Sequence, residues 1–349
     1  MLCADSVRPA LRRRLFALCL LGACAHDVPA SAPAGRDYTS EARPDTREPV
    51  RVRPMREPVP GAPPRKLPPP KPLLSAKLSR EARPRIVALG DLHGDLDATR
   101  RALRLAGAID AADHWSGGEL TLVQTGDVLD RGDDDRALED LLARLREEAE
   151  AAGGEVIVLA GNHELMNTML SFSYVTAGGY AAFGGESGRA AAFRPGGPYA
   201  ALLATQPILI KVGNNVFVHG GILPEHIRYG LDRMNDELSS FMRGELQSPP
   251  EVLLEGNGLL WTRLYSNVPD RADCPGLATT LAQLGAKRMV VGHTPQLSGI
   301  TSACDGQVLR IDTGMSRYYG GPVQALEIQG DALRVLKEHE APALPIAVP

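Results

Sequence analysis

The sequence has no excess of basic charge and few aromatic residues. Its 349 residues contain 38 lysines and arginines against 42 aspartates and glutamates, a formal net charge of -4. A chain without a net basic field is not expected to bind nucleic acid or anionic membranes through charge. Aromatic residues make up 5% of the chain, so no platform for stacking nucleobases is evident. The 44% of hydrophobic residues are typical of a globular protein with a sizeable core.

The chain also lacks an apolar run long enough to cross a bilayer. Three arginines precede a short apolar run at residues 15–23, an arrangement typical of a secretory signal peptide. The run ends in Leu-Gly-Ala-Cys, which resembles the bacterial lipobox, where the cysteine becomes lipidated. We therefore predict a lipoprotein-type signal peptide at residues 1–23 and a lipid anchor at Cys24. The expected location is the cell envelope, as an outer-membrane lipoprotein facing the periplasm; a secreted or periplasmic protein is the alternative.

Nearly half of the chain's 28 prolines lie between the predicted anchor and residue 80. Such a segment has little apolar periodicity and cannot build a core. We interpret residues 24–80 as a disordered, proline-rich tether that lets an anchored domain reach away from the membrane. The folded domain is then expected at residues 81–340.

In the folded part, short β-branched runs repeatedly end in a glycine-bearing turn with polar residues. The runs precede Asp91, Asp127, Asn162, His219, His293 and Asp312. Helical patterns separate them at residues 96–106, 133–152 and 277–284. Strands that alternate with helices predict an α/β domain. Because ligands in such domains bind beyond the strand ends, we expect these loops to converge. Residues 167–206 fit no strand period and are predicted to form a helical insertion near the site.

Residues after these strands form a set of potential metal ligands. Each one taken alone could be a turn residue or a buried structural histidine. Four of the eight histidines, however, lie directly after predicted strands beside glycine, as do the key acids. Mixed oxygen and imidazole donors suit Mn, Fe or Zn better than Ca or Mg, and the absence of thiolates argues against a structural zinc site. The candidate ligands are Asp91, His93, Asp127, Asn162, His219 and His293.

The motifs GDLHGD, GDVLDRG, GNHE, VHGG and VGHT occur in this order and resemble the metallophosphoesterases of the phosphoprotein phosphatase superfamily. The resemblance covers residues 86–316. Longer stretches, including GNHELMN, AAAFRPGGPYA and RIDTGMS, are similar to the bacterial Shewanella-like protein phosphatases. The resemblance implies a calcineurin-like metallophosphoesterase fold, in which a central β-sandwich of mixed sheets is flanked by helices. It also implies a metal-dependent phosphomonoesterase, most readily a protein phosphatase that cleaves phosphoserine, phosphothreonine or phosphotyrosine by in-line attack of a metal-bridging hydroxide.

The resemblance further assigns roles to the candidate ligands. Two divalent metal ions are implied, of which Mn is expected to support activity in vitro. The first ion is bound by Asp91 and His93, and Asp127 bridges it to the second. Asn162, His219 and His293 complete the coordination of the second ion.

The same resemblance implies how a phosphate would be bound and cleaved. Arg131 and Asn162 would hold the phosphate oxygens, and His163, oriented by Asp130, would protonate the leaving oxygen. Because the sequence departs from the eukaryotic serine/threonine members near residues 261–263, a second phosphate-binding arginine has no secure counterpart. Arg263 is the candidate by its position.

Two other functions remain open at this point. A nucleotide or dinucleoside polyphosphate hydrolase would use the same metal loops. A non-catalytic lipoprotein that binds a phosphorylated ligand would have lost a metal ligand or the acid pair, and the sequence keeps all of them. With Cys24 lipidated, an even pair of cysteines remains in an oxidising compartment. We therefore predict a disulfide between Cys274 and Cys304. The expected partners are a phosphoprotein or phosphopeptide substrate and, through Cys24, a membrane.

Overall fold

The computed structural model describes residues 73–267 and 270–338. The predicted signal peptide, Cys24 and most of the predicted tether lie outside these residues. Leu74 and Leu78 are buried in the core, and β1 (Ser79–Arg80) pairs with a strand of the fold. The folded part therefore includes residues that the sequence analysis placed in the tether. None of the helices in the described residues has the length and apolar character needed to span a bilayer.

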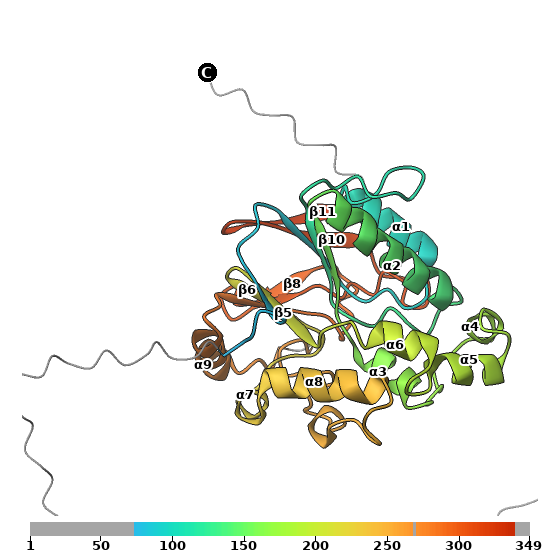
Figure 1. The fold of residues 1–349 in the computed structure, drawn as a ribbon. Helices are drawn as coiled ribbons and strands as arrows, with labels where there is room; N and C mark the ends of the chain where they lie inside the picture. The colour runs from blue at the N-terminus through green and yellow to red at the C-terminus, as the bar shows by residue number, and fades with distance from the viewer. Residues whose placement is uncertain (1–72, 268–269, 339–349) are drawn as a thin grey trace, which may run out of the picture. The chain divides into compact units, whose positions relative to one another are not determined.

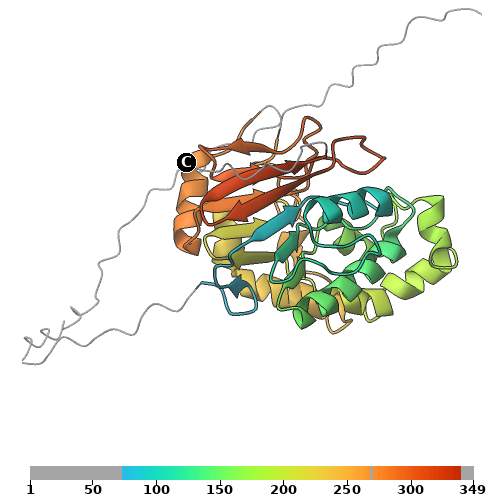
Figure 2. The same cartoon turned by 90° about the horizontal axis from the view of Figure 1, so that it is seen from above.

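Two mixed sheets stack against each other (Figure 1). The first has the order β11-β10-β2-β3-β4 and the second the order β1-β5-β6-β7-β9-β8. Strands β2, β3 and β4 run parallel, as do β6, β7 and β9. Figure 2 shows β10 and β11 (red) beside β2 (blue). The strands are β2 (Ile86–Leu89), β3 (Thr121–Gln124), β4 (Glu155–Val158), β5 (Leu209–Val212), β6 (Asn215–Val218), β7 (Arg288–Val291), β8 (Thr301–Ala303), β9 (Val308–Arg310), β10 (Gln324–Gln329) and β11 (Ala332–Lys337).

Helices cover the outer faces of the two sheets. Figure 1 shows α1 (Leu96–Leu105) and α2 (Asp135–Ala151) together on one side, and α7 (Pro224–Tyr229) and α8 (Leu231–Met242) on the other. Between β4 and β5 the chain forms several short helices, three of them within the predicted insertion. The remaining helices are α3 (Asn162–Thr168), α4 (Ala177–Ala181), α5 (Glu186–Phe193), α6 (Pro198–Leu203), α9 (Cys274–Leu284) and the 3-10 turn η1 (Glu251–Leu253).

The alternation of side chains along the strands builds three apolar layers. Ile86 and Ala88 of β2 pack between the sheets, whereas Val87 packs under α1 and α2. In the second sheet, Phe217 of β6 packs between the sheets, and Val218 packs toward α8. Successive side chains of each strand thus point to opposite faces of the sheet, and both faces are buried. The structure thus confirms the α/β fold with a central sandwich of mixed sheets.

Cys274 and Cys304 form the predicted disulfide. Their Cα atoms lie 5.3 Å apart, and the bond closes a loop of 30 residues. Cys274 begins α9, and Cys304 lies in the turn between β8 and β9. The bond therefore joins the start of α9, the helix before β7, to the turn between β8 and β9, and the loop that it closes contains β7 and His293.

Glu139 on α2 is a buried acid that makes stability depend on pH. The amide nitrogen of Gln206 lies 3.3 Å from its carboxylate. Burial, followed by the nearby charge of Glu164, raises the pKa of Glu139 to about 8. An unfolded glutamate loses its proton near pH ~4.3. The folded state therefore binds more protons between these two values, and stability falls as the pH rises through that window.

We expect Glu139→Gln to stabilise the protein, because the amide needs no proton to stay neutral. The gain should be small at pH 4.5 and should grow by up to roughly 1.4 kcal/mol for each pH unit toward pH 8. Urea unfolding of both proteins at pH 5 and pH 8 measures this difference. Glu147 lies on the same helix but is exposed. Glu147→Gln therefore serves as the control and should change stability by less than about 0.5 kcal/mol. A gain from Glu139→Gln that does not vary with pH would contradict the assignment.

Candidate metal and phosphate site

The six predicted ligands converge at one edge of the sandwich. Each follows the end of a strand, and each side chain is buried. Because β2, β3 and β4 are parallel, as are β6 and β7, the loops after them emerge at corresponding ends of the two sheets. The structure thus brings together Asp91 and His93 after β2, Asp127 after β3, Asn162 after β4, His219 after β6 and His293 after β7.

The first group of donors surrounds His93. Its Nε2 atom lies 3.8 Å from Asp91 Oδ2 and 3.8 Å from Asp127 Oδ2. Its Nδ1 atom lies 3.1 Å from the carbonyl of Leu129, so Nδ1 carries the hydrogen and Nε2 presents its lone pair to the acids. Burial lowers the pKa of His93 to about 3. The ring is therefore neutral and can bind a cation through Nε2.

The second group of donors surrounds His219. Its Nε2 atom lies 3.3 Å from Asp127 Oδ2, 2.9 Å from Asn162 Oδ1 and 3.1 Å from His293 Nδ1. Asp127 thus contacts both groups. Asp127 therefore lies between the two groups, and its role as a bridging ligand stays a prediction.

The hydrogen bonds of the two histidines in this group show that a cation fits here. His219 donates Nδ1–H to the carbonyl of Thr125 at 2.9 Å, and His293 donates Nε2–H to the carbonyl of Trp261 at 3.0 Å. Their facing nitrogens, 3.1 Å apart, would therefore present two lone pairs to each other. Such a contact is repulsive unless a proton or a metal ion lies between the nitrogens.

Buried acids add a second reason for a cation. Burial, then the charges of Asp312 and Asp127, raises the pKa of Asp91 well above its usual range. Burial also raises the pKa of Asp312 to about 6, and its Oδ2 atom has no hydrogen-bond partner among the described residues. Asp127 differs, because His219 and His163 outweigh its burial and hold its pKa well below the usual value. Carboxylates crowded in this way, together with imidazole and amide donors, fit divalent Mn, Fe or Zn.

Asp312 is a site residue that the sequence analysis did not assign. It follows β9 directly, and its position after the run VLRI was a signal of the same kind as for the six ligands. It lies close enough to Asp91 for their charges to interact strongly.

His163 and Asp130 form a buried pair beside the metal ligands. His163 Nδ1 lies 2.6 Å from Asp130 Oδ2. The ring's Nε2 atom lies 3.3 Å from Arg131 Nη2 and 3.8 Å from Asp127 Oδ2. Burial lowers the pKa of His163, but Asp127 and Asp130 outweigh burial and raise it. Because Asp130 accepts from Nδ1–H, Nε2 is the ring nitrogen that faces Arg131 and Asp127, where it can exchange a proton with a bound substrate.

Arg131 has no carboxylate within 4.0 Å in the part of the chain that the structure describes. Three tyrosine rings surround its guanidinium instead. The centroids of Tyr174, Tyr318 and Tyr319 lie 4.7, 5.2 and 5.1 Å from its Cζ. A cavity of about 320 Å³ opens here, lined by Arg131, Tyr318 and His93 among others. The positive charge of Arg131 is thus available to an anion, and aromatic rings line its surroundings.

The three tyrosines could not be found from the sequence. Tyr174 belongs to the segment between α3 and α4, and Tyr318 and Tyr319 follow β9, more than a hundred residues later. With few aromatic residues in the chain, nothing in the composition indicated that three of them meet at one arginine.

Arg189 is a further residue of the site that could not be found from the sequence. It lies on α5 within the insertion and is completely buried. Its Nη2 atom lies 3.2 Å from Asp130 Oδ1 and 2.7 Å from Asp135 Oδ2. It also donates to the amide oxygen of Asn167, and the amide nitrogen of Asn167 donates to Asp130 at 3.0 Å. The insertion therefore holds the acid that orients His163.

Arg263 lies beside the second group of donors. It is exposed, and its Nη1 atom donates to the carbonyl of His293 at 2.8 Å and to Thr294 Oγ1 at 2.9 Å. These bonds fix the guanidinium next to His293. They do not place it beside Arg131.

The loops of the site are unusually tight. Several functional residues adopt left-handed backbone conformations, which cost free energy in any residue with a side chain. The chain also approaches closely at Gly161, where a Cβ atom would lie 2.2 Å from Asp127 Oδ1. The left-handed residues of the site are His93 (φ 47°), Asp127 (φ 56°), Asp130 (φ 72°), Arg131 (φ 68°) and His293 (φ 70°).

Comparisons with known proteins identify the family of the chain. The model of the calcineurin-like phosphoesterase family matches residues 84–297. Shewanella-like protein phosphatase 2 of Arabidopsis thaliana is 37% identical over 71% of this chain and 76% of the relative. Shewanella-like protein phosphatase 1 of Plasmodium berghei is 34% identical over 68% of this chain and 69% of the relative. A mutant of a cold-active protein tyrosine phosphatase has a similar structure, with a TM-score of 0.64, 25% identity and coverage of 76% of this chain and 85% of that one.

The fold and the site define a metal-dependent phosphatase, which is a hydrolase. The chain belongs to the calcineurin-like phosphoesterase family, and its relatives place it among the Shewanella-like protein phosphatases.

Proposed function

We propose that this enzyme is a protein phosphatase that hydrolyses phosphorylated side chains and prefers phosphotyrosine. The observation that carries the proposal is the position of Arg131 and His163 among tyrosine rings. Two divalent ions, with Mn, Fe and Zn as candidates, would activate water and neutralise charge on the phosphoryl group. The proposed setting is the cell envelope, with Cys24 as a lipid anchor.

The residues of the site have separable roles in this proposal. Arg131 and Asn162 bind phosphate oxygens, and Arg263 is the candidate for a second cationic contact. His163, held by Asp130, gives the proton on Nε2 to the leaving oxygen. The side chain that carries the phosphate therefore leaves next to His163.

The surroundings of His163 favour an aryl leaving group. The ring of Tyr174 lies 5.1 Å from the ring of His163, measured between centroids. A phenol released at Nε2 would contact this ring, whereas a serine or threonine side chain is too short to pack on it. Stacking of this kind contributes about 0.5–1.5 kcal/mol. The description of a structural neighbour as a protein tyrosine phosphatase supports the same preference.

The aromatic rings also support a second candidate function. A nucleobase could stack on the exposed ring of Tyr318, so a nucleotide hydrolase belongs in the same test. The third possibility, a protein that binds a phosphorylated ligand without cleaving it, is disfavoured because the ligand set and the Asp130–His163 pair are complete.

An activity panel tests the proposal. Peptides of one sequence that differ in a single phosphotyrosine, phosphoserine or phosphothreonine should be compared with nucleotides and dinucleoside polyphosphates, with metal content measured on the same sample. We expect the highest kcat/KM on the phosphotyrosine peptide. Tyr174→Leu should lower kcat/KM for the phosphotyrosine peptide more than for the phosphoserine peptide, because both use Arg131 but only the aryl group packs on the ring of Tyr174. Faster hydrolysis of the nucleotides would reject the protein phosphatase assignment.

The role of His163 gives a separate prediction. We expect His163→Asn to lower kcat by about 10²- to 10⁴-fold on substrates with poor leaving groups. The loss should shrink as the leaving group becomes more acidic, because such a group departs without a proton. A series of aryl phosphates of graded acidity measures this dependence. The same loss across the whole series would show that His163 is not the general acid.

A further inference from the structure

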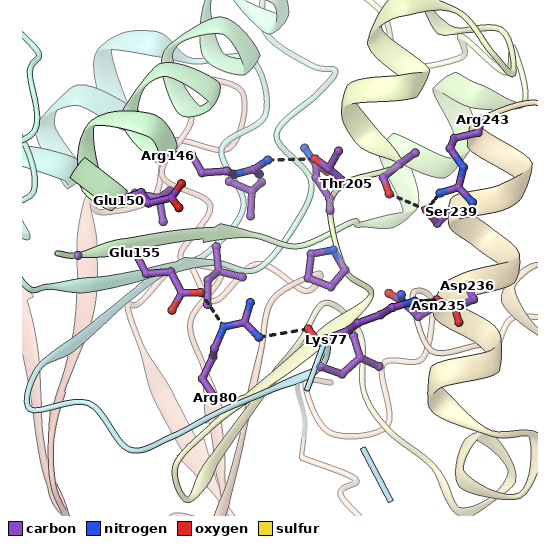
Figure 3. A pocket seen from close by; sticks show the side chains of 18 of the residues that line it. Lys77, Arg80, Arg146, Glu150, Glu155, Thr205, Asn235, Asp236, Ser239 and Arg243 are labelled. Carbon is purple, nitrogen blue, oxygen red and sulfur yellow. Dashed lines mark hydrogen bonds and ion pairs between the residues drawn. The ribbon is translucent and has the colours of Figure 1, made fainter. Parts of the chain in front are cut away.

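A second cavity, much larger than the one beside Arg131, lies away from the residues assigned to the chemistry. Its volume is about 980 Å³, and it is bounded by β1, β4, the end of α2, the segment before β5, and α8. Figure 3 shows Arg146 and Thr205 on one wall, Arg80 and Glu155 on another, and Ser239 and Arg243 of α8 on a third. None of the metal ligands lines this cavity.

One wall of the cavity is the open edge of a sheet. Strand β4 is the last strand of its sheet among the described residues, with β3 as its partner. The amides of Glu155 and Leu159 donate to carbonyls on the β3 side. Since alternate residues of a parallel strand face opposite neighbours, the N–H and C=O groups of Val156 and Val158 face away from β3. Both valines line the cavity.

The outward edge of β4 already binds one other segment of backbone. The amide of Ala160, the next outward-facing residue, donates to the carbonyl of Pro207 at 3.0 Å. The edge can therefore form hydrogen bonds with an extended chain. Among the described residues the amides of Val156 and Val158 have no such partner, and the two residues are 3% and 1% exposed, so a peptide would have to enter the cavity to reach them.

The charges around the cavity favour an anion. Five cationic side chains and three anionic ones line it. Most of the cations are paired: Lys77 with Asp236 at 3.1 Å, and Arg80 with Glu155 at 2.7 Å. Arg243 pairs with Glu245, just outside the cavity.

Arg146 differs from these cations. It is half-buried, and its Nη1 atom donates to Thr205 Oγ1 at 3.0 Å. Among the described residues no carboxylate lies within 4.0 Å of it. The acid whose charge acts on Arg146 is Glu139, and burial raises the pKa of Glu139 to about 8. The guanidinium is thus partly desolvated and lies outside ion-pair distance of any described carboxylate, although Glu150 also lines the cavity.

We propose that this cavity binds an extended, acidic peptide segment. The peptide backbone adds to the edge of β4 at Val156 and Val158, and an acidic side chain of the peptide pairs with Arg146. Strand addition supplies affinity through main-chain hydrogen bonds, and the charged pair supplies selectivity. The inference rests on the proposed function in one respect, because the segment would belong to a protein substrate of the phosphatase.

The probe for the test is a fluorescein-labelled hexapeptide of alternating Glu and Val, without phosphate. Fluorescence polarisation with the manganese-loaded full chain measures its affinity. We expect Arg146→Gln to weaken binding by about tenfold, since a charged hydrogen bond is lost. Arg144→Gln is the matched control. Arg144 lies on the same helix, pairs with Glu148 and does not line the cavity, so its loss should leave affinity within twofold. A peptide with Lys in place of Glu should not bind.

Two further arms test the position of the peptide. Two peptides are compared, one N-methylated at its odd-numbered residues and the other at its even-numbered residues. Their affinities should differ, because only one of the two sets of amides faces β4 and donates hydrogen bonds to it. Inorganic phosphate that saturates the catalytic site should not displace the probe. The proposal is overturned if Arg146→Gln binds like the unchanged protein, if both methylated peptides bind like the parent, or if phosphate displaces the probe. Because the probe is not hydrolysed, a failed activity panel and a failed binding test remain distinct results.

Discussion

Asp127→Asn is expected to lower kcat by roughly 10³-fold or more, equivalent to about 4 kcal/mol of transition-state stabilisation. Asp127 contacts both groups of donors, through His93 on one side and His219 on the other. The amide keeps the shape of the side chain but removes the charge that two cations would share. The fold should survive, because the backbone amide of His163 can donate to the remaining oxygen as it does to Asp127 Oδ1.

The measurement combines kcat on an aryl phosphate, metal content by mass spectrometry and circular dichroism on one sample. The variant should retain native ellipticity and lose bound metal. Asp97→Asn is the control, since Asp97 is exposed on α1 and pairs with Arg101 at 3.5 Å. It should keep at least half of the activity. Undiminished activity of Asp127→Asn, or of the unchanged enzyme after thorough chelation, would refute the two-metal site.

Arg189→Met is expected to destabilise the protein by about 3–5 kcal/mol and to lower kcat as well. Arg189 is fully buried and pairs with Asp130 and Asp135, so its loss leaves two acids buried without their cation. Urea unfolding measures the first effect. The second effect follows because Asp130 no longer holds the ring of His163 firmly.

Two further variants separate these effects. Arg189→Met combined with Asp135→Asn should recover part of the stability, because one buried charge is removed with the arginine. Arg189→Lys keeps the charge but not the forked geometry that reaches Asp130, Asp135 and Asn167 together. It should lose activity most strongly on poor leaving groups, as expected for an effect that acts through His163. A loss of the same size on all leaving groups would show that Arg189 is structural only.

The metal loops could be predicted from the sequence because each of them is local. A β-branched run of four to six residues, a glycine and a polar side chain lie within one short segment, and all six runs form the strands β2, β3, β4, β6, β7 and β9. Their convergence follows from the geometry of parallel strands. The chemistry of the donor set then indicates metal.

Contacts that join distant segments gave no such signal. Arg189 is one arginine among many, and its role depends on the path of α5 back to Asp130, which no local pattern encodes. The tyrosines around Arg131 come from two distant segments, since Tyr174 precedes β5 and Tyr318 and Tyr319 follow β9. Strand β1 has two residues next to a proline-rich region, so its pairing with β5 depends on the burial of Leu78.

The left-handed residues of the site have a consequence for directed evolution. Arg131 (φ 68°) holds a conformation that glycine adopts without strain, and among the described residues it has no carboxylate within 4.0 Å. Asp130 (φ 72°) is also left-handed, but its buried pairs with Arg189 and His163 stabilise it there. A library screened for heat resistance alone would therefore be expected to enrich glycine at position 131 and to collect well-folded, inactive enzymes. The residues that make this protein a catalyst are thus among those that it could replace to become more robust, and a screen must select for turnover to keep them.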